Sequence, residues 1–323
     1  MGLFNKGSLQ TLRYRPRLFN AVEARSFGGS NQDGKSPSYS WGITRFAFSD
    51  TARTSNFRSM TMRRYNLTGA ATQIDGSTLL MVGGLDSSNV VQDRIDRQSF
   101  SEYEIATDHG NLVKAMQRAA SFASSTDVYR GGGLDGSSVY QNTVGKINPE
   151  VASNEAVCCY LGATMTGMAG HHDSRAGYFM CGLNVFALQT VLQRVDFVDD
   201  SIDTTYSNMY SSAQRGAGGG NENRLVFSGG QVGATTYSNM IQSLDLADGA
   251  TAFQSGDLDV GKQDHAGSSS QSTMFHHQGA LSFQNETNKI AKHEIDISEN
   301  SVLFDSLAGA ALFQGLGAYG GSP

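Results

Sequence analysis

The sequence contains little of what marks a disordered, disulfide-stabilised or membrane-spanning protein. Proline occurs only 4 times in 323 residues, which excludes a proline-rich linker. The 3 cysteines, Cys158, Cys159 and Cys181, are too few for a disulfide framework, and we expect buried thiols. No apolar run approaches the roughly 18 residues of a membrane helix, which predicts no membrane insertion. The first residues lack the apolar segment of a secretory signal, so we expect synthesis in a cytosol without export.

Glycine, in contrast, is abundant, and the charge is unevenly distributed. There are 38 glycines, which indicates many tight turns. Residues 1–64 carry 11 basic and 3 acidic groups, a net charge of +8, whereas the whole chain has a net charge of −6. A basic first fifth on an acidic body favours either a docking surface for an acidic neighbour or arginines spread over a solvated rim.

The main signal is an internal repeat. Short apolar runs that end in glycine recur along the chain, as in Leu80-Met81-Val82-Gly83-Gly84. The closing glycines fall at 29, 84, 133, 182, 230 and 279, so the intervals are 55, 49, 49, 48 and 49 residues. A second anchor, a short strand centred on an apolar residue, is placed at 46, 95, 147, 195, 244 and 295. A third apolar position precedes the closing glycine by 21 residues, at Leu112, Leu161, Met209 and Leu258.

Each repeat is interpreted as four short strands. In the unit around residue 140, the expected strands cover 121–125, 127–132, 140–147 and 155–161, from the innermost to the outermost. A four-stranded sheet of about 49 residues cannot bury both of its faces alone, whereas radial stacking of such sheets covers the faces and leaves short edges. The sequence therefore predicts an all-β fold, a six-bladed β-propeller with four antiparallel strands per blade. The period of about 50 residues favours Kelch-type repeats over the shorter WD40 repeats.

The residues also resemble the Kelch family. The glycine doublet, the Arg94-Ile95-Asp96 strand and the spaced residues Leu112, Ala115 and Arg118 match the Kelch pattern. The tryptophan usual late in each Kelch blade is missing, because Trp41 is the only tryptophan in the chain.

A second likeness is to Kelch-like repeats in structural proteins of tailed bacteriophages that infect marine bacteria and cyanobacteria. The resemblance covers roughly residues 76–300. It is carried by Asn239-Met240-Ile241, Gly256-Asp257-Leu258, Lys262, Ser268-Ser269-Ser270 and the run from Phe275 to Gly279, and by a sister form at Gly177-Tyr178-Phe179-Met180-Cys181-Gly182 and Val191-Leu192-Gln193-Arg194-Val195-Asp196.

This resemblance implies a structural virion protein, associated with the tail, a fibre or the particle surface. The expected partners are other virion structural proteins in an oligomeric assembly, and a host cell-surface glycan or protein where the propeller also serves attachment. We expect no nucleic-acid partner, because the arginines lack interleaved aromatic residues. The expected location is the virion, after synthesis in the host cytoplasm.

The ends of the chain are predicted to lie outside a propeller that spans 17–311. Residues 17–24 are placed to form an innermost strand, and the tail segment 308–312 aligns with 68–72, so both ends compete for one position. We favour 1–16 as a basic docking arm and 312–323 as a C-terminal tail. The candidate partner-binding residues are Arg13, Arg15, Arg17, Arg53, Arg58, Arg63 and Arg64.

Two similar turns, at 84–89 and 133–138, contain aspartate, serine and asparagine. Such loops bind Ca²⁺ or sugar hydroxyls in some proteins, but the same residues form turns for purely local reasons. The candidate loop-binding residues are Asp86, Ser87, Asn89, Asp135 and Ser137.

No catalytic residue, metal site or cofactor is predicted. His171-His172, His265 and His276-His277 fall on inner and second strands, but adjacent strand residues face opposite ways and no carboxylate stands at a diagnostic spacing. The acidic cluster Asp196, Asp199, Asp200 and Asp203 is interpreted as a solvated loop rather than a glycosidase pair. The alternatives to a virion protein are a Kelch-fold metalloenzyme, either an oxidase or glycan-active, and an intracellular Kelch interaction module.

Overall fold

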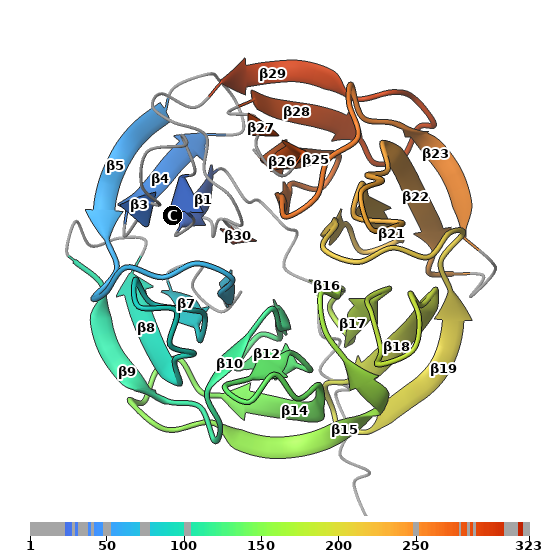
Figure 1. Ribbon diagram of the computed structural model, residues 1–323. Coiled ribbons are helices and arrows are strands. Elements are labelled where there is room, and N and C mark those ends of the chain that lie inside the picture. The colour runs from blue at the N-terminus through green and yellow to red at the C-terminus, as the bar shows by residue number, and fades with distance from the viewer. Residues whose placement is uncertain are drawn as a thin grey trace, which may run out of the picture.

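The computed structural model is an all-β protein in which four-stranded antiparallel sheets are arranged radially as the blades of a β-propeller (Figure 1). It describes the backbone of residues 23–27, 30–31, 38–39, 42–47, 53–71, 78–99, 105–247, 252–277, 279–282, 285–286, 289–306 and 316–318. Side chains are described over 59–70, 78–99, 105–247, 252–277, 279 and 290–303. The described residues contain no helix, and therefore none long and apolar enough to cross a membrane.

Five blades, here named A to E, follow one another along the chain. Blade A contains β6 (Thr68–Ala71), β7 (Thr78–Val82), β8 (Arg94–Ser99) and β9 (Thr107–Asn111). Blade B contains β11 (Ala120–Ala123), β12 (Val128–Gly131), β14 (Gln141–Ile147) and β15 (Ala156–Met165). Blade C contains β16 (Ala169–His172), β17 (Ala176–Met180), β18 (Val191–Asp196) and β19 (Ile202–Asn208). Blade D contains β20 (Ala217–Gly220), β21 (Arg224–Ser228), β22 (Met240–Asp245) and β23 (Phe253–Asp257). Blade E contains β24 (Ala266–Ser269), β25 (Thr273–His277), β28 (Lys289–Glu294) and β29 (Val302–Ser306).

One further four-stranded sheet, here named the terminal sheet, joins the two ends of the described chain. Its strands, in spatial order, are β30 (Leu316–Ala318), β1 (Glu23–Phe27), β4 (Gly42–Ala47) and β5 (Arg53–Ser59). Short two-stranded ribbons are formed by β2 (Ser30–Asn31) with β3 (Ser38–Tyr39), by β10 (Met116–Gln117) with β13 (Leu134–Asp135), and by β26 (Ala280–Ser282) with β27 (Asn285–Glu286).

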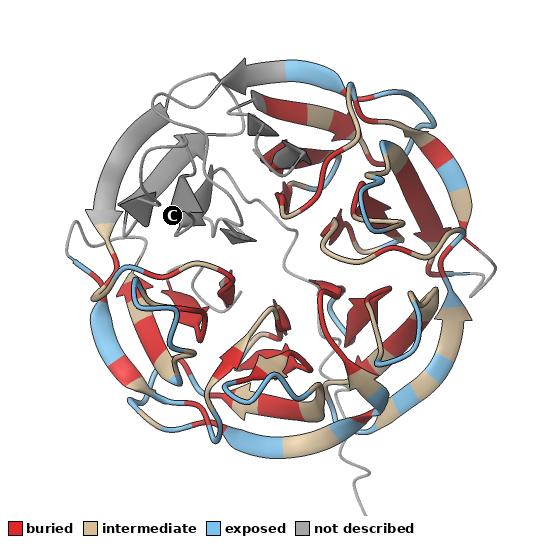
Figure 2. Cartoon of the chain, in the orientation of Figure 1, coloured by how far each residue is buried: buried red, intermediate tan, exposed pale blue. Residues whose placement is uncertain are grey.

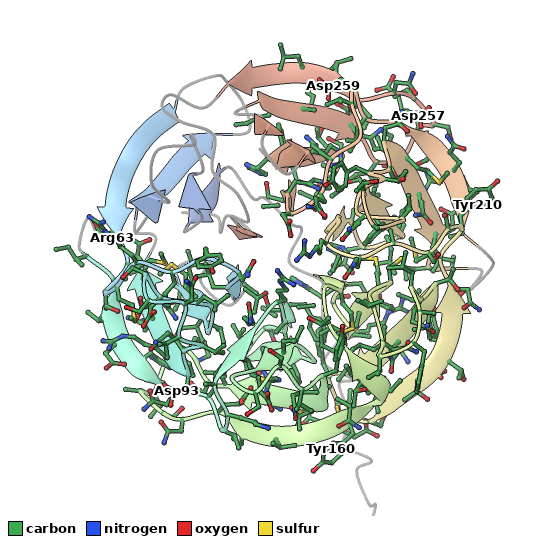
Figure 3. The ribbon with its side chains drawn as sticks, viewed as in Figure 1. Arg63, Asp93, Tyr160, Tyr210, Asp257 and Asp259 are labelled. Carbon is green, nitrogen blue, oxygen red and sulfur yellow. The ribbon has the colours of Figure 1, made fainter. Side chains whose placement is uncertain are left out.

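The first strands of the blades lie around the axis, where β6, β11, β16, β20 and β24 contact one another in sequence. The fourth strands form the outer rim, which carries the exposed rings of Tyr160 and Tyr210 (Figure 3). Buried residues concentrate on the inner three strands of each blade (Figure 2). The apolar core is a series of layers between neighbouring blades: Phe122 of blade B, for example, packs on Phe179 of blade C with ring centroids 4.6 Å apart.

The predicted strands of the repeat are confirmed, and so are two of its three anchors. The closing glycines at 84, 133, 182 and 230 lie at one structural position, where the backbone N–H donates to a carbonyl from the next repeat, as Gly84 does to Met116 at 2.7 Å. The third anchor is buried in every described copy, at Leu112, Leu161, Met209 and Leu258.

The second anchor is wrong at two of its positions. Ile95 pairs with Val82 at the end of β7, whereas Val195 pairs with Gly177 near the start of β17, so the two residues are not equivalent. Ile295 lies beyond the end of β28. Apolar residues occur at more than one point along the third strand and just beyond its end, so a short motif centred on one of them can match different points in different repeats.

The ends also differ from the prediction. Glu23 and Ala24 belong to β1, which has β4 on one side and β30 on the other, so they are not part of an innermost strand. The first position is held by β30, which lies within the segment 312–323 that we predicted as a tail. Residues 1–22 and 307–315 lie outside the described residues, so the docking arm and the domain boundaries stay predictions.

Candidate functional site

Five residues with left-handed backbone form a hydrogen-bonded chain around the propeller axis. They lie just before the first strands of blades A to E and have φ values of 55° at Asn66, 54° at Arg118, 63° at Gly167, 60° at Arg215 and 51° at Asp264. Each N–H donates to the carbonyl of the preceding member, over 2.8 Å from Arg118 to Asn66, 3.0 Å from Gly167 to Arg118, 2.7 Å from Arg215 to Gly167 and 2.8 Å from Asp264 to Arg215. We call these residues the axial ring.

Left-handed backbone at residues other than glycine is uncommon, because the Cβ is crowded there. Four of the five axial-ring residues are not glycine. A strained backbone conformation persists only where the surrounding structure holds it in place. Such conformations are frequent at ligand-binding sites and in switch regions. The axial ring is therefore a candidate site on backbone geometry alone.

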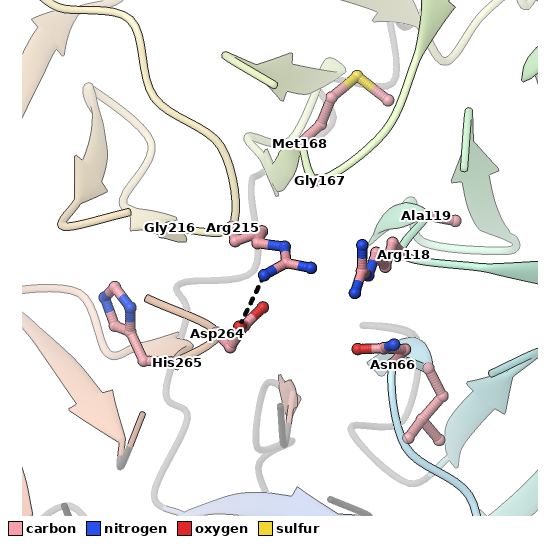
Figure 4. A pocket seen from close by; sticks show the side chains of 10 residues that line it. Asn66, Arg118, Ala119, Gly167, Met168, Arg215, Gly216, Asp264 and His265 are labelled. Carbon is pink, nitrogen blue, oxygen red and sulfur yellow. Dashed lines mark hydrogen bonds and ion pairs between the residues drawn. The ribbon is translucent and has the colours of Figure 1, made fainter. Parts of the chain in front are cut away.

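The polar side chains of the axial ring converge on one opening (Figure 4). Arg215 Nη1 lies 3.3 Å from Asp264 Oδ2 and 3.5 Å from Gln263 Oε1. The guanidinium groups of Arg118 and Arg215 face each other across the opening (Figure 4). Asn66 donates through Nδ2 to Gln117 Oε1 at 3.1 Å.

The axial ring lines a pocket with about 400 Å³ of space free of protein atoms, part of it open to solvent. Met168, Gly216 and His265 also border this pocket, and they border a second, adjoining pocket that runs along the first strands of the blades. The described walls therefore combine a polar rim with a floor of small and apolar residues, which is the usual composition of a ligand site.

The charged side chains of the described residues that line the opening sum to a positive charge. The side chains of the axial ring carry two guanidinium groups and one carboxylate. Burial and the neighbouring charge of Arg215 lower the pKa of Arg118 to about 10. Among the described residues, the Nε atoms of Arg118 and Arg215 are buried and have no hydrogen-bond partner.

The loops between the second and third strands surround this opening on the same face. Isolated bridges join the segment before each blade to these loops, at Tyr65 with Leu85, Thr166 with Leu183 and Gln214 with Gln231. Three of the loops expose apolar side chains, with 53% of Val90, 52% of Val139 and 92% of Phe186 accessible. We call this side of the propeller the loop face.

The predicted loop-binding aspartates lie on the loop face, and both organise their own turns. Asp86 Oδ1 accepts the N–H groups of Ser88 at 2.7 Å and Val90 at 3.0 Å. Asp135 Oδ1 accepts those of Ser137 at 2.8 Å and Val139 at 2.9 Å.

The other oxygen of each carboxylate accepts from a glutamine, Gln92 at 2.7 Å and Gln141 at 3.0 Å. Asp135 also pairs with Lys114. The two carboxylates are thus used by the turns, while Ser87 and Asn89 remain exposed at the surface, where Asn89 accepts the Tyr65 hydroxyl at 2.6 Å.

The predicted partner-binding arginines are not brought together. Arg13, Arg15 and Arg17 lie outside the described residues, as do the side chains of Arg53 and Arg58 in β5. Arg63 is exposed and lies at the outer edge of the propeller (Figure 3). The prediction that Arg64 binds a partner is wrong, because its side chain is 0% exposed and forms an ion pair with Asp96 at 2.9 Å.

The histidines are buried and neutral. His171 and His172 lie on the first strand of blade C, as expected, and His276 and His277 on the second strand of blade E. Burial lowers the pKa of His172 to about 4 and that of His277 to about 3. Across the described part of the chain, no group of three or more histidine, cysteine, aspartate or glutamate residues is arranged to hold a metal ion.

The acidic cluster links blades B and C rather than forming only a solvated loop. Asp200 accepts the Tyr129 hydroxyl at 2.6 Å, and its carboxylate lies 3.0 Å from Lys146 Nζ. Asp196 pairs with Arg194 of the same strand at 3.1 Å.

The sequence pattern places Arg118 in the repeat but does not indicate the axial ring as a site. The signal that could have found it is the recurrence of polar residues at 66, 118, 215 and 264, close to the repeat period. No protein-family model matches the chain, and no curated protein matches it.

Proposed function

We propose that this protein is a six-bladed Kelch-like propeller that acts as a structural protein of a tailed bacteriophage particle, binding neighbouring virion proteins through its loop face. The phage assignment is supported by the sequence resemblance stated above. The binding role is supported by the exposed apolar side chains of the loop face, which is the observation that carries the proposal.

The terminal sheet is the evidence for a sixth blade. Its first strand, β30, contacts β24 of blade E and β6 of blade A, which are the two neighbours a ring-closing blade requires. The register between its third and fourth strands shifts at Ile43, next to the closing end of β1, and the corresponding shifts in the five blades begin at Ile95, Val144, Leu192, Ile241 and Ile290. A bulge repeated at one position indicates a sixth copy of the same unit.

The residues that carry the resemblance to phage repeats fall at equivalent points of the blades. Gly182 and Gly279 close equivalent second strands, with φ values of 111° and 115°. Leu258 occupies the buried position that Met209 holds one repeat earlier. Residues that match in sequence are thus also placed at matching points of successive blades.

Val90, Val139 and Phe186 lie in the loops of three successive blades, A, B and C. Large accessible apolar side chains lose contact with water when a partner covers them, which favours association. A neighbouring protein that lies across the axis would cover several of these loops at once.

The test replaces Val90, Val139 and Phe186 by serine together and measures incorporation into phage particles by quantitative mass spectrometry of purified virions. We expect the parent chain to remain with the particles through high-salt washing and the triple variant to be lost. The matched control replaces Val151 and Val198 by serine. These residues are 62% and 92% exposed and follow the third strands, so they lie on the opposite face.

Absence of the parent chain from purified particles would contradict the virion assignment. Equal loss of the two variants, with the folded state of both verified by circular dichroism, would contradict the role of the loop face.

A further inference from the structure

The axial ring carries more positive than negative charge in a confined place. Arg118 and Arg215 face each other across the pocket, and Asp264 lies beside Arg215 (Figure 4). With both guanidinium groups protonated, these three side chains sum to one positive charge. The Asp264 side chain is 6% exposed and that of Arg215 14%, so solvent screens this charge only partly.

Arg118 is the less compensated of the two arginines. Its guanidinium forms no ion pair with any carboxylate of the described residues, whereas Arg215 has Asp264. Removing a cation from water without a counter-ion costs free energy. The low pKa of Arg118 has the same origin, since burial and the charge of Arg215 both disfavour its protonated form.

Some hydrogen-bond donors of the pocket have no acceptor among the described residues. The Nε atoms of Arg118 and Arg215 are buried and unpaired among the described residues, although each guanidinium can donate five hydrogen bonds. A planar guanidinium presents its donors as a fork that matches the oxygens of a carboxylate or a phosphate. Two such forks that face one space therefore favour a ligand with several oxygen acceptors.

We propose that the pocket of the axial ring binds a small oxyanion, a carboxylate or phosphate group, between the guanidinium groups of Arg118 and Arg215. The oxyanion supplies the counter-charge that no carboxylate of the described residues gives Arg118, and it accepts hydrogen bonds from both arginines. Asp264 holds Arg215 in place and limits the affinity through its own negative charge. The site would bind this group whether or not the protein is a virion component.

The size and openness of the pocket agree with such a ligand. The enclosed cavity measures about 50 Å³. One water requires about 10–15 Å³ on this measure, so the cavity accommodates one small anionic group. The pocket opens on the loop face, where Val90, Val139 and Phe186 are accessible. A molecule that reaches the axis would therefore pass between apolar loops before its anionic group meets the arginines.

The test titrates the protein with inorganic phosphate and, separately, with acetate, using isothermal titration calorimetry at constant ionic strength maintained with chloride. We expect saturable binding of at least one of the two anions, and the tighter one identifies the preferred group. Arg118→Gln should weaken binding about tenfold or more, because a charge-assisted hydrogen bond is lost. Arg215→Gln should weaken it further, since Asp264 is then left without its cation.

Asp264→Asn separates a ligand site from a purely structural role. Removing this negative charge should tighten anion binding several-fold, whereas a structural role predicts no gain. The matched control is Arg175→Gln, which removes an arginine that pairs with Asp173 and is 69% exposed, away from the axial ring. It should leave the affinity unchanged.

Thermal unfolding supplies a second readout that does not require a measurable heat of binding. Phosphate or acetate should raise the melting temperature of the parent protein, because a ligand that binds only the folded state stabilises it. Without anion, Arg118→Gln should melt no lower than the parent, since a half-buried cation that pairs with no described carboxylate has been removed. Two results would overturn the site: no saturable binding of either anion by the parent, or equal binding by the parent and Arg118→Gln.

Discussion

Blades A and E bury a cation at the same repeat position but surround it with different groups. Arg64 stands four residues before the start of β6, and Lys262 stands four residues before the start of β24. Arg64 is 0% exposed and Lys262 is 1% exposed. In both blades, the long basic side chain thus enters the interior from the same repeat position.

In blade A the cation is matched by an ion pair. Arg64 lies 2.9 Å from Asp96 and donates through Nη1 to the carbonyls of Gly83 at 2.7 Å and Arg94 at 2.8 Å. Asp96 also accepts two hydrogen bonds from Thr61, at 3.0 Å from N and 2.6 Å from Oγ1.

In blade E the equivalent of Asp96 is Ala291, as the pairing of β7 with β8 and of β25 with β28 shows. The equivalents of Met81 and Val82 are His276 and His277. Burial and then the charge of Lys262 lower the pKa of both histidines. The repeat therefore determines the backbone conformation and which positions are buried. The groups that surround a buried polar side chain differ from one blade to another. The two arrangements differ in their response to mutation and to pH.

The largest effect is expected for Asp96→Asn in blade A. This change leaves the buried Arg64 without its counter-ion, and breaking a buried pair in this way costs about 3–5 kcal/mol of unfolding free energy. Urea denaturation followed by circular dichroism measures it. The matched control is Asp108→Asn, because Asp108 is 57% exposed and pairs with Arg94 at the surface, where we expect a loss below about 1 kcal/mol. Equal losses in the two variants would show that the buried pair does not stabilise blade A.

A smaller effect is expected in blade E when the pH is lowered. Its histidines have pKa values below their ordinary value of about 6.5, so the unfolded chain binds protons that the folded chain does not. Stability is then fully present above about pH 6.5 and is lost as the pH falls toward the folded pKa, which is about 3 for His277 and about 4 for His172 in blade C. At pH 5, one such histidine accounts for about 2 kcal/mol.

The measurement is the unfolding free energy of the parent and of His277→Gln between pH 7 and pH 5. The variant should lose less stability over this interval, because one group that titrates only in the unfolded state is gone. Hydrogen exchange should show blade E opening before blade A as the pH is lowered. An identical pH dependence in the parent and the variant would contradict the burial of a neutral His277.

Much of this fold follows from the sequence, because glycine at a turn is a local requirement that recurs with the repeat. Gly84 and Gly133 have φ values of 98° and 108°, which few other residues adopt, so their spacing reports directly on the blades. The apolar anchor of the third strand was less informative. Ile95 and Ile147 are both buried apolar strand residues, and only the pairing partners reveal that they occupy different positions.

The candidate site was less predictable for a different physical reason. Arg118 and Arg215 lie 97 residues apart and meet only because the blades return to one axis. For Arg64 the sequence led to a wrong prediction of an exposed binding residue. Arg64 follows the exposed Arg63, and nothing in the sequence indicates that its side chain is buried against Asp96. Charge in a sequence can be counted, but its burial depends on partners that the repeat alone does not specify.

The smallest effect is expected for Cys181→Gly and concerns the residue that precedes the closing glycine in blades B and C. Gly132 has a φ of 61°, and a Cβ there would lie 2.5 Å from the Met165 carbonyl oxygen, so Gly132→Ala should cost about 1–3 kcal/mol. The equivalent residue in blade C is Cys181, with a φ of 57° and a fully buried side chain.

Cys181→Gly relieves the left-handed strain and loses the buried thiol, and these opposing effects should leave the stability within about 1 kcal/mol of the parent. Differential scanning calorimetry of both variants tests the contrast, with Gly136→Ala as the control because the nearest atom to its Cβ would be Val91 Cβ at 3.9 Å. If Cys181→Gly destabilised the protein as much as Gly132→Ala, the buried thiol rather than the backbone would determine this position in blade C, and the two positions would not be equivalent in energy.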